Sequence, residues 1–296
     1  MKILAPLAKF EEVTPLAFAG ADQFYCGLLD AKEALNDRPN TGEYNFPDIS
    51  ELSKAVEMAH SLGKTIHLVI NNPTPTLKRA VAQAKIAGRL GIDGLILSNN
   101  LLIKRIKGMN LKMNLGGSCL LAVCNSWSVK FAQELGLKTL HLPRQLGIND
   151  VKRIVDNTSG VELSVFGMMG MCVNIEAYCF LHYLKKDYFI PCKHFKVKKI
   201  TGRSKVSKEE MNKKITMPTV SCAMCALKKL KAMGVTSVKI EGRGAPLHEK
   251  VRNVSAIKQA LQATQSYRKD KDYQACCKKI FKEHFNKPCK PEYCYF

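Results

Sequence analysis

The residues of this 296-residue sequence with the clearest chemical potential are its cysteines, of which there are twelve. Cys172 and Cys179 follow the apolar run "VELSVF", Cys192 comes later, and Cys222 and Cys225 form a CxxC. Clustered thiols close to loop segments are poorly explained as core residues. Thiolates are soft ligands that bind iron–sulfur clusters or zinc. We predict a [4Fe–4S] cluster on Cys172, Cys179, Cys192 and Cys222, with Cys225 as the alternative to Cys222.

Other uses of these thiols rank lower. A zinc ribbon requires paired CxxC knuckles, which the spacing of the four cysteines does not match. The opening "MKILAPLAKFEEV" lacks the long apolar core of a signal peptide, so we expect a cytoplasmic protein in which thiols stay reduced. Cys26, Cys119 and Cys124 lie in or near apolar stretches and are expected to be core residues.

The end of the chain carries a second group of thiols, Cys276, Cys277, Cys289 and Cys294. Adjacent cysteines are awkward ligands for one tetrahedral site, and their spacing fits no standard metal motif. A second metal site and ordinary packing or surface thiols therefore both stay open.

Two further motifs place charged residues directly after apolar strand-like segments. "VKIEGR" offers Glu241 and Arg243, and "HLPRQL" offers Arg144. We predict that Glu241 handles or orients a proton and that the two guanidinium groups hold a carboxylate or phosphate. The alternatives are a structural ion pair and a solvated surface arginine. Nucleotide-binding loops, a GxSxG motif and an HExxH motif are not found.

The formal net charge is +21, from 46 Lys and Arg against 25 Asp and Glu. Such an excess favours an anionic partner, most often RNA or DNA, although a basic protein need not bind nucleic acid. Between Lys185 and Lys214, the sequence contains eleven Lys and Arg residues and three acidic residues. Within that segment we predict RNA-binding residues Lys193, Lys196, Lys198, Lys199, Arg203 and Lys205.

Short apolar segments alternate with amphipathic helical ones along the chain. Helical periodicity covers residues 48–63, 75–91 and 126–136, and several of these segments end in Gly. Alternation of this kind predicts a parallel sheet, and eight strands match a (β/α)8 barrel. The predicted strands are residues 2–6, 22–27, 65–71, 94–99, 111–117, 139–143, 161–167 and 237–242.

Two segments interrupt this alternation and define the expected domains. Residues 1–244 form the barrel, with a basic insertion at about 172–217, and residues 245–296 form a helical extension with a Cys-rich tail. The carboxyl ends of barrel strands meet on one face, where barrel enzymes bind substrates. The polar residues expected there are Asn71, Asn72, Asn99, Ser118, Arg144, Cys172, Glu241 and Arg243. No apolar run is long enough to span a membrane.

Three motifs, "ILAPLAKFEEVTPLAFAGADQFYCGL", "ELGLKTLHLPRQL" and "AMGVTSVKIEGR", resemble the peptidase U32 family over about residues 1–243. The resemblance implies a [4Fe–4S] cluster on four cysteines and oxygen-independent hydroxylation of tRNA, rRNA or ubiquinone precursors. It also implies prephenate as the oxygen donor for the RNA-acting members. By position, the family's ligands fall on Cys172, Cys179, Cys192 and Cys222, the last lying twelve residues before Gly234.

The sequence departs from the family where the first cysteine is preceded by "FGMMGM" and the second by "AY". The expected function is iron–sulfur-dependent hydroxylation of tRNA or rRNA. Three alternative functions stay open. The first is hydroxylation of a quinone precursor together with a related U32 chain. The second is a non-catalytic iron–sulfur module that binds RNA, and peptidase activity ranks last.

Overall fold

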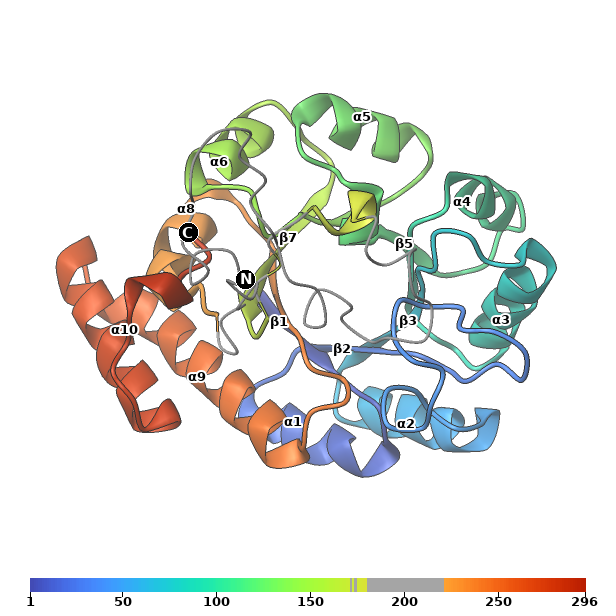
Figure 1. Ribbon diagram of the computed structural model, residues 1–296, viewed down its shortest axis with the longest axis horizontal. Helices are drawn as coiled ribbons and strands as arrows, with labels where there is room; N and C mark the ends of the chain where they lie inside the picture. The colour runs from blue at the N-terminus through green and yellow to red at the C-terminus, as the bar shows by residue number, and fades with distance from the viewer. Residues whose placement is uncertain (171, 173–174, 180–220) are drawn as a thin grey trace, which may run out of the picture.

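The strands of the computed structural model close into a barrel of eight parallel strands in sequential order (Figure 1). The structure describes residues 1–170, 172, 175–179 and 221–296. The predicted (β/α)8 fold is confirmed. The strands are β1 (Lys2–Pro6), β2 (Gln23–Cys26), β3 (Thr65–Ile70), β4 (Gly94–Leu97), β5 (Asn114–Gly117), β6 (Thr139–His141), β7 (Glu162–Met168) and β8 (Ser237–Ile240).

Successive side chains of a strand point to opposite faces of the sheet, and this alternation divides the core in two. Ile3 and Ala5 of β1 belong to the large core between the barrel and its helices. Leu4 belongs instead to a small apolar layer inside the barrel. The other members of this inner layer are Tyr25, Val69 and Ile96. The barrel is therefore filled with side chains below its carboxyl end.

Helices surround the barrel as a ring (Figure 1). Asp48, Asn99 and Asn125 accept hydrogen bonds from backbone N–H groups in the first turns of α2, α4 and α5, as helix N-caps do. The helices are α1 (Val13–Ala19), α2 (Ile49–Ser61), α3 (Leu77–Arg89), α4 (Asn100–Lys107), α5 (Ser126–Glu134), α6 (Ile148–Asp156), α8 (Leu227–Met233), α9 (Leu247–Ser266) and α10 (Asp270–Phe285). Short 3-10 helices are η1 (Phe10–Glu12), η2 (Cys119–Leu121), η3 (Glu176–Tyr178), η6 (Met224–Ala226) and η7 (Pro291–Tyr293).

The C-terminal segment folds back onto the barrel. Helix α9 packs against α1 and β1, and α10 packs against α9 (Figure 1). Beyond α10, Cys222 N donates to Tyr293 O at 2.7 Å, and Tyr295 N donates to Cys222 O at 3.1 Å. The hydroxyl of Tyr295 donates to the carbonyl of Met169 just after β7. The last residues therefore lie at the carboxyl end of β7, while the division at residue 244 stays a prediction from the sequence.

Most of the basic insertion lies outside the described residues. This holds for Cys192 and for all six predicted RNA-binding residues: Lys193, Lys196, Lys198, Lys199, Arg203 and Lys205. Among the helices of the described residues, none is long and apolar enough to cross a membrane.

Candidate active site

A buried ion pair between Arg144 and Glu241 lies at the carboxyl end of the barrel. Arg144 follows β6 and Glu241 follows β8, so residues almost a hundred positions apart meet across the mouth. The two guanidinium Nη atoms donate to the two carboxylate oxygens, each at 2.7 Å. The guanidinium also donates to Glu176 of η3 and to the carbonyl of Gly170. Bidentate pairs of this kind fix the orientation of both groups.

The same pair sets the protonation of both side chains. Burial disfavours the charged form of Glu241, but the Arg144 charge and its hydrogen bonds outweigh burial and lower the pKa of this carboxyl. Burial likewise acts against the charge of Arg144, and Glu241 and Glu176 outweigh it, so the guanidinium pKa is raised. Phe166 of β7 lies beneath the pair, with its ring centroid 4.0 Å from the Arg144 Cζ atom. Both groups are therefore charged at neutral pH.

Arg243 is 2 % exposed and holds the loop that follows β2. Its Nη2 donates to Asn36 Oδ1 at 2.8 Å and lies 3.6 Å from Asp37 Oδ1, and its Nη1 donates to Asn45 Oδ1 at 3.4 Å. Gly27, just after β2, leaves the space for these groups: a Cβ there would lie 2.4 Å from Arg243 Nη1.

Gly242 allows Glu241 and Arg243 to take different positions at the mouth. Its φ of +107° lies in the region that only glycine adopts readily. Glu241 thereby meets Arg144, while Arg243 reaches the loop after β2. Glu241 and Arg243 therefore take part in separate ion pairs, although only Gly242 lies between them in the sequence.

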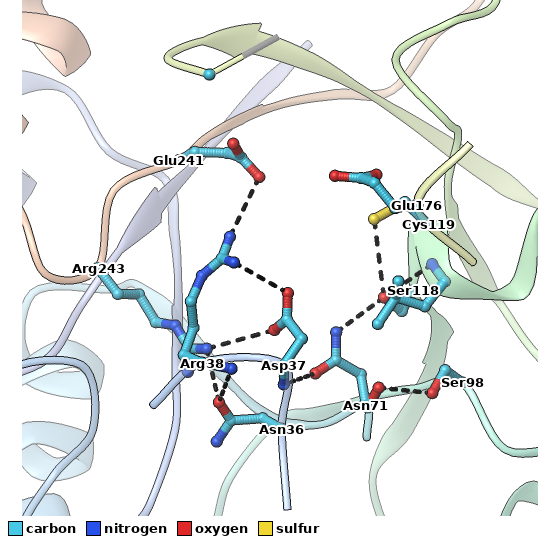
Figure 2. Close-up of polar contacts among 12 residues, drawn as sticks. Asn36, Asp37, Arg38, Asn71, Ser98, Ser118, Cys119, Glu176, Glu241 and Arg243 are labelled. Atoms are coloured by element: carbon cyan, nitrogen blue, oxygen red, sulfur yellow. Dashed lines mark hydrogen bonds and ion pairs between the residues drawn. The ribbon is translucent and has the colours of Figure 1, made fainter. Parts of the chain in front are cut away.

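Asp37 and Arg38, which were not among the residues predicted from the sequence, complete the ion network (Figure 2). Arg38 Nη1 lies 3.3 Å from Asp37 Oδ2, and Arg38 Nη2 lies 3.5 Å from Glu241 Oε1. Burial acts to raise the pKa of Asp37, but Arg38 and Arg243 outweigh it and hold the pKa at about 2. The signal for these residues was the polar triplet "NDR" in a long loop after a strand.

A row of neutral polar groups continues from this network across the mouth (Figure 2). Asn71 Oδ1 accepts from the backbone N–H of Asp37 at 3.0 Å, and Asn71 Nδ2 donates to Ser118 Oγ at 3.0 Å. Ser118 Oγ lies 3.9 Å from the thiol of Cys119. Asn71 and Ser118 therefore lie in the site as expected, and Cys119, expected to be a core residue, borders it.

Other residues expected at the mouth have structural partners. Asn99 caps α4 through the backbone N–H of Leu102 at 2.9 Å. Asn72 Nδ2 donates to the carbonyl of Ala34 at 2.7 Å, which ties β3 to the loop after β2.

The cysteines at this end of the barrel surround the end of β7. Cys172 follows β7 by a few residues, and its carbonyl accepts from Gln145 Nε2 at 2.9 Å. Cys222 pairs with Met168 at the end of the same strand. Cys179 ends η3, whose Glu176 contacts Arg144, and is buried. Within the described ranges no three Cys, His, Asp or Glu side chains are arranged to bind a metal ion.

The thiols of the C-terminal segment lie near the CxxC. The neighbouring thiol of Cys277 is the main reason that the pKa of Cys225 is lowered to about 7. Cys294 pairs with Cys222 as an isolated bridge. The second metal site suggested for the tail thiols stays a prediction.

Known proteins similar to this chain include tRNA hydroxylation protein P of Escherichia coli, which is 27% identical over 182 residues. That match covers 61% of this chain but only 39% of the relative. The tRNA hydroxylation protein P1 of Bacillus subtilis is 24% identical over 277 residues, which is 88% of this chain and 63% of the relative. The chain therefore spans well under two thirds of the length of the Escherichia coli protein.

Among solved structures, the U32 peptidase Mk0906 matches with a TM-score of 0.52 at 12% identity, over 82% of this chain and 93% of that one. Tryptophan synthase from M. tuberculosis matches with a TM-score of 0.51 at 12% identity, over 88% of this chain and 91% of that one. These likenesses show the barrel fold. The sequence model of peptidase family U32 matches residues 8–295, almost the entire chain. The chain therefore belongs to peptidase family U32.

Proposed function

We propose that this protein is an iron–sulfur enzyme that hydroxylates tRNA without molecular oxygen. The observation that carries the proposal is the partly buried ion network of Arg144, Glu241, Arg38 and Asp37 at the carboxyl end of a U32 barrel. Barrel enzymes bind their substrates at this end. The names of the relatives from two bacteria give tRNA hydroxylation as the reaction.

A [4Fe–4S] cluster on Cys172, Cys179, Cys192 and Cys222 would supply electron-transfer or Lewis-acid chemistry at this end of the barrel. Thiolates suit such a cluster, and Cys172 and Cys222 both lie at the end of β7. Cys192 lies outside the described residues. Cys225 is the alternative ligand to Cys222, and the neighbouring Cys277 thiol lowers its pKa to about 7.

The protein's own charged groups orient the reactants. Glu241 is held as a carboxylate by Arg144 and Arg38, so it accepts hydrogen bonds from a substrate and orients a proton. Arg144 and Arg243 keep fixed positions through their carboxylate and amide partners, which orients both guanidinium groups in advance for an anionic reactant. A small carboxylate such as prephenate fits the role of oxygen donor, and the basic residues of the insertion fit the role of phosphate contacts.

Mass spectrometry of tRNA nucleosides from a deletion strain tests the proposed reaction. We expect the loss of one hydroxylated nucleoside, its return with the wild-type gene, and no return with Glu241→Gln. The matched control is Glu57→Gln on α2, which exchanges an exposed carboxylate and is expected to restore modification fully. An unchanged tRNA profile together with altered rRNA or quinones would contradict the proposal and favour the corresponding substrate.

Iron and acid-labile sulfide measured on anaerobically purified protein test the cofactor. We expect about four of each per chain with absorbance near 400 nm, as four thiolates on a [4Fe–4S] cluster require. Loss of iron is expected in Cys172→Ser and Cys222→Ser but not in Cys26→Ser, a buried thiol on β2. Colourless protein loaded with zinc would refute the cluster.

A further inference from the structure

Lys239 of β8 places an ammonium group inside the barrel. Its neighbours Val238 and Ile240 belong to the core outside the barrel, so the alternation of the strand turns Lys239 inward. Glu241 lies two residues further and faces the same side. Lys239 therefore lies one step deeper than the Arg144–Glu241 pair, and it is only 8 % exposed.

The ammonium of Lys239 contacts aromatic faces. Its Nζ lies 4.3 Å from the ring centroid of Tyr25 and 5.9 Å from that of Phe166. Within the described part of the chain, it has neither a hydrogen bond nor an ion pair. Cation–π contacts offset only part of the cost of removing an ammonium from water. Among the residues that the structure describes, no carboxylate therefore pairs with this buried cation.

Unlike Lys239, each of the three arginines of the site lies close to a carboxylate. Arg144 pairs with Glu241 and Glu176, Arg38 lies close to Asp37 and Glu241, and Arg243 lies close to Asp37. With Lys239 the network contains four cations and three carboxylates. These carboxylates are engaged by the arginines, so within the described residues the positive charge of Lys239 is in excess.

The surroundings of Lys239 lie on the side of the candidate active site. The carboxylates of Asp37 and Glu241, both at the carboxyl end of the barrel, lie close enough for their negative charges to act on its ammonium. A polar cavity of about 570 Å³ opens at the opposite end and is lined by His67 and His141 but not by Lys239. The ammonium is therefore assigned to the floor of the candidate active site.

We propose that Lys239 binds the carboxylate of a small organic acid at the floor of the candidate active site. A carboxylate would supply the missing negative charge, and the faces of Tyr25 and Phe166 would contact an apolar or ring-shaped body attached to it. A phosphodiester of a polynucleotide is too bulky to reach a side chain this buried. The choice of an organic acid rests on the proposed function, in which such an acid donates oxygen.

Binding of 3-phenylpropionate and of its neutral amide, 3-phenylpropionamide, to the purified full-length protein tests this assignment by calorimetry. We expect the wild type to bind the carboxylate at least tenfold more tightly than the amide. Lys239→Met is expected to abolish this preference. Because methionine fits between aromatic rings and removes an uncompensated charge, we expect the variant's melting temperature to be unchanged or higher.

Lys2→Met is the matched control, because Lys2 lines the cavity at the opposite end. It should keep the preference for the carboxylate. Equal affinity of the wild type for acid and amide, loss of the preference in Lys2→Met, or tighter binding of inorganic phosphate than of the acid would each overturn the assignment. The measurement needs no RNA. An unchanged tRNA nucleoside profile in the deletion strain would refute the proposed function, but it would not affect the assignment of the Lys239 site.

Discussion

At the scale of single residues, the protein keeps charged and titratable groups inside the barrel and controls each by its neighbours. Glu241 is ionised because Arg144 and Arg38 outweigh its burial. His67 and His141 are held neutral, since burial is the largest influence on the pKa of each and lowers it. The interior therefore combines fixed charges at the mouth with uncharged imidazoles below it.

His67 makes the stability of the protein depend on pH. Burial lowers its pKa from 6.5 to about 4; Asp93 and Glu162 oppose this shift, whereas Lys2 and Lys239 add to it. Between these two values the unfolded chain binds more protons than the folded one, so stability falls as the pH falls from 6.5 to 4. We expect a loss of up to about 3 kcal/mol, measured by urea unfolding across this range.

His67→Gln should remove most of this slope, whereas His248→Gln on α9 should retain it. Burial lowers the pKa of His141 as well, so part of the pH dependence should remain in the His67→Gln variant. A His67→Gln protein with the full wild-type slope would show that other groups control acid stability.

At the scale of elements, the site depends on a loop and a helix that are distant in sequence. The loop after β2 brings Asp37 and Arg38 to Glu241, and Arg243 secures that loop from the end of β8. Helix α9 is in turn attached to the segment after β1 through Lys250, which is 1 % exposed. The end of β8 is thus tied to the loop after β2, and the helix that follows β8 is tied to the segment after β1.

The Lys250–Glu12 pair should contribute strongly to the docking of α9. Lys250 Nζ lies 2.7 Å and 2.8 Å from the two Glu12 oxygens, and Glu12 Oε2 also accepts from the backbone N–H of Ala8 at 2.9 Å. Lys250→Met leaves a buried carboxylate without its cation, and we expect a loss of about 3–5 kcal/mol in urea unfolding.

The exposed pair of Lys152 and Asp156 on α6 is the control for this variant. Lys152→Met should cost less than about 1 kcal/mol, because both side chains are about half exposed. Equal losses in the two variants would mean that the buried pair has no special role in holding α9.

At the scale of the whole molecule, the dominant property is the net charge of +21. The described mouth of the barrel holds nearly balanced charges, so the excess lies elsewhere along the chain. Eleven of the Lys and Arg residues occur between Lys185 and Lys214. A strongly basic protein attracts polyanions over long distances, and salt weakens this attraction.

The affinity for total tRNA should therefore fall steeply with salt. Exchange of Lys193, Lys196 and Lys198 for Gln should reduce the slope of log K against log salt by about 2–3 if each contacts a phosphate. The matched control exchanges the exposed Lys54, Lys85 and Lys152 on α2, α3 and α6. Filter binding at several salt concentrations measures the slope for each variant. Identical slopes for the insertion variant and the control would show that these three lysines of the insertion do not contact RNA.

The sequence by itself determined the barrel, because strands and helices are encoded locally by alternation, helical periodicity and caps. It also predicted that Arg144, Glu241 and Arg243 lie at the mouth, because polar residues directly after apolar strands reach the carboxyl end of a barrel. It did not identify Asp37 and Arg38, which lie in a long irregular loop with no periodic signal. Only the closure of the barrel brings that loop to Glu241.

The position of Lys239 was likewise decided by tertiary structure. In the sequence it is one lysine of a basic chain, and the alternation of β8 alone cannot say which face of the strand points inward. The closed barrel places the ammonium of Lys239 near the rings of Tyr25 and Phe166, and no carboxylate of the described residues pairs with it. Local patterns thus fix which segments become strands, whereas the balance of buried charges depends on contacts between segments far apart in the chain.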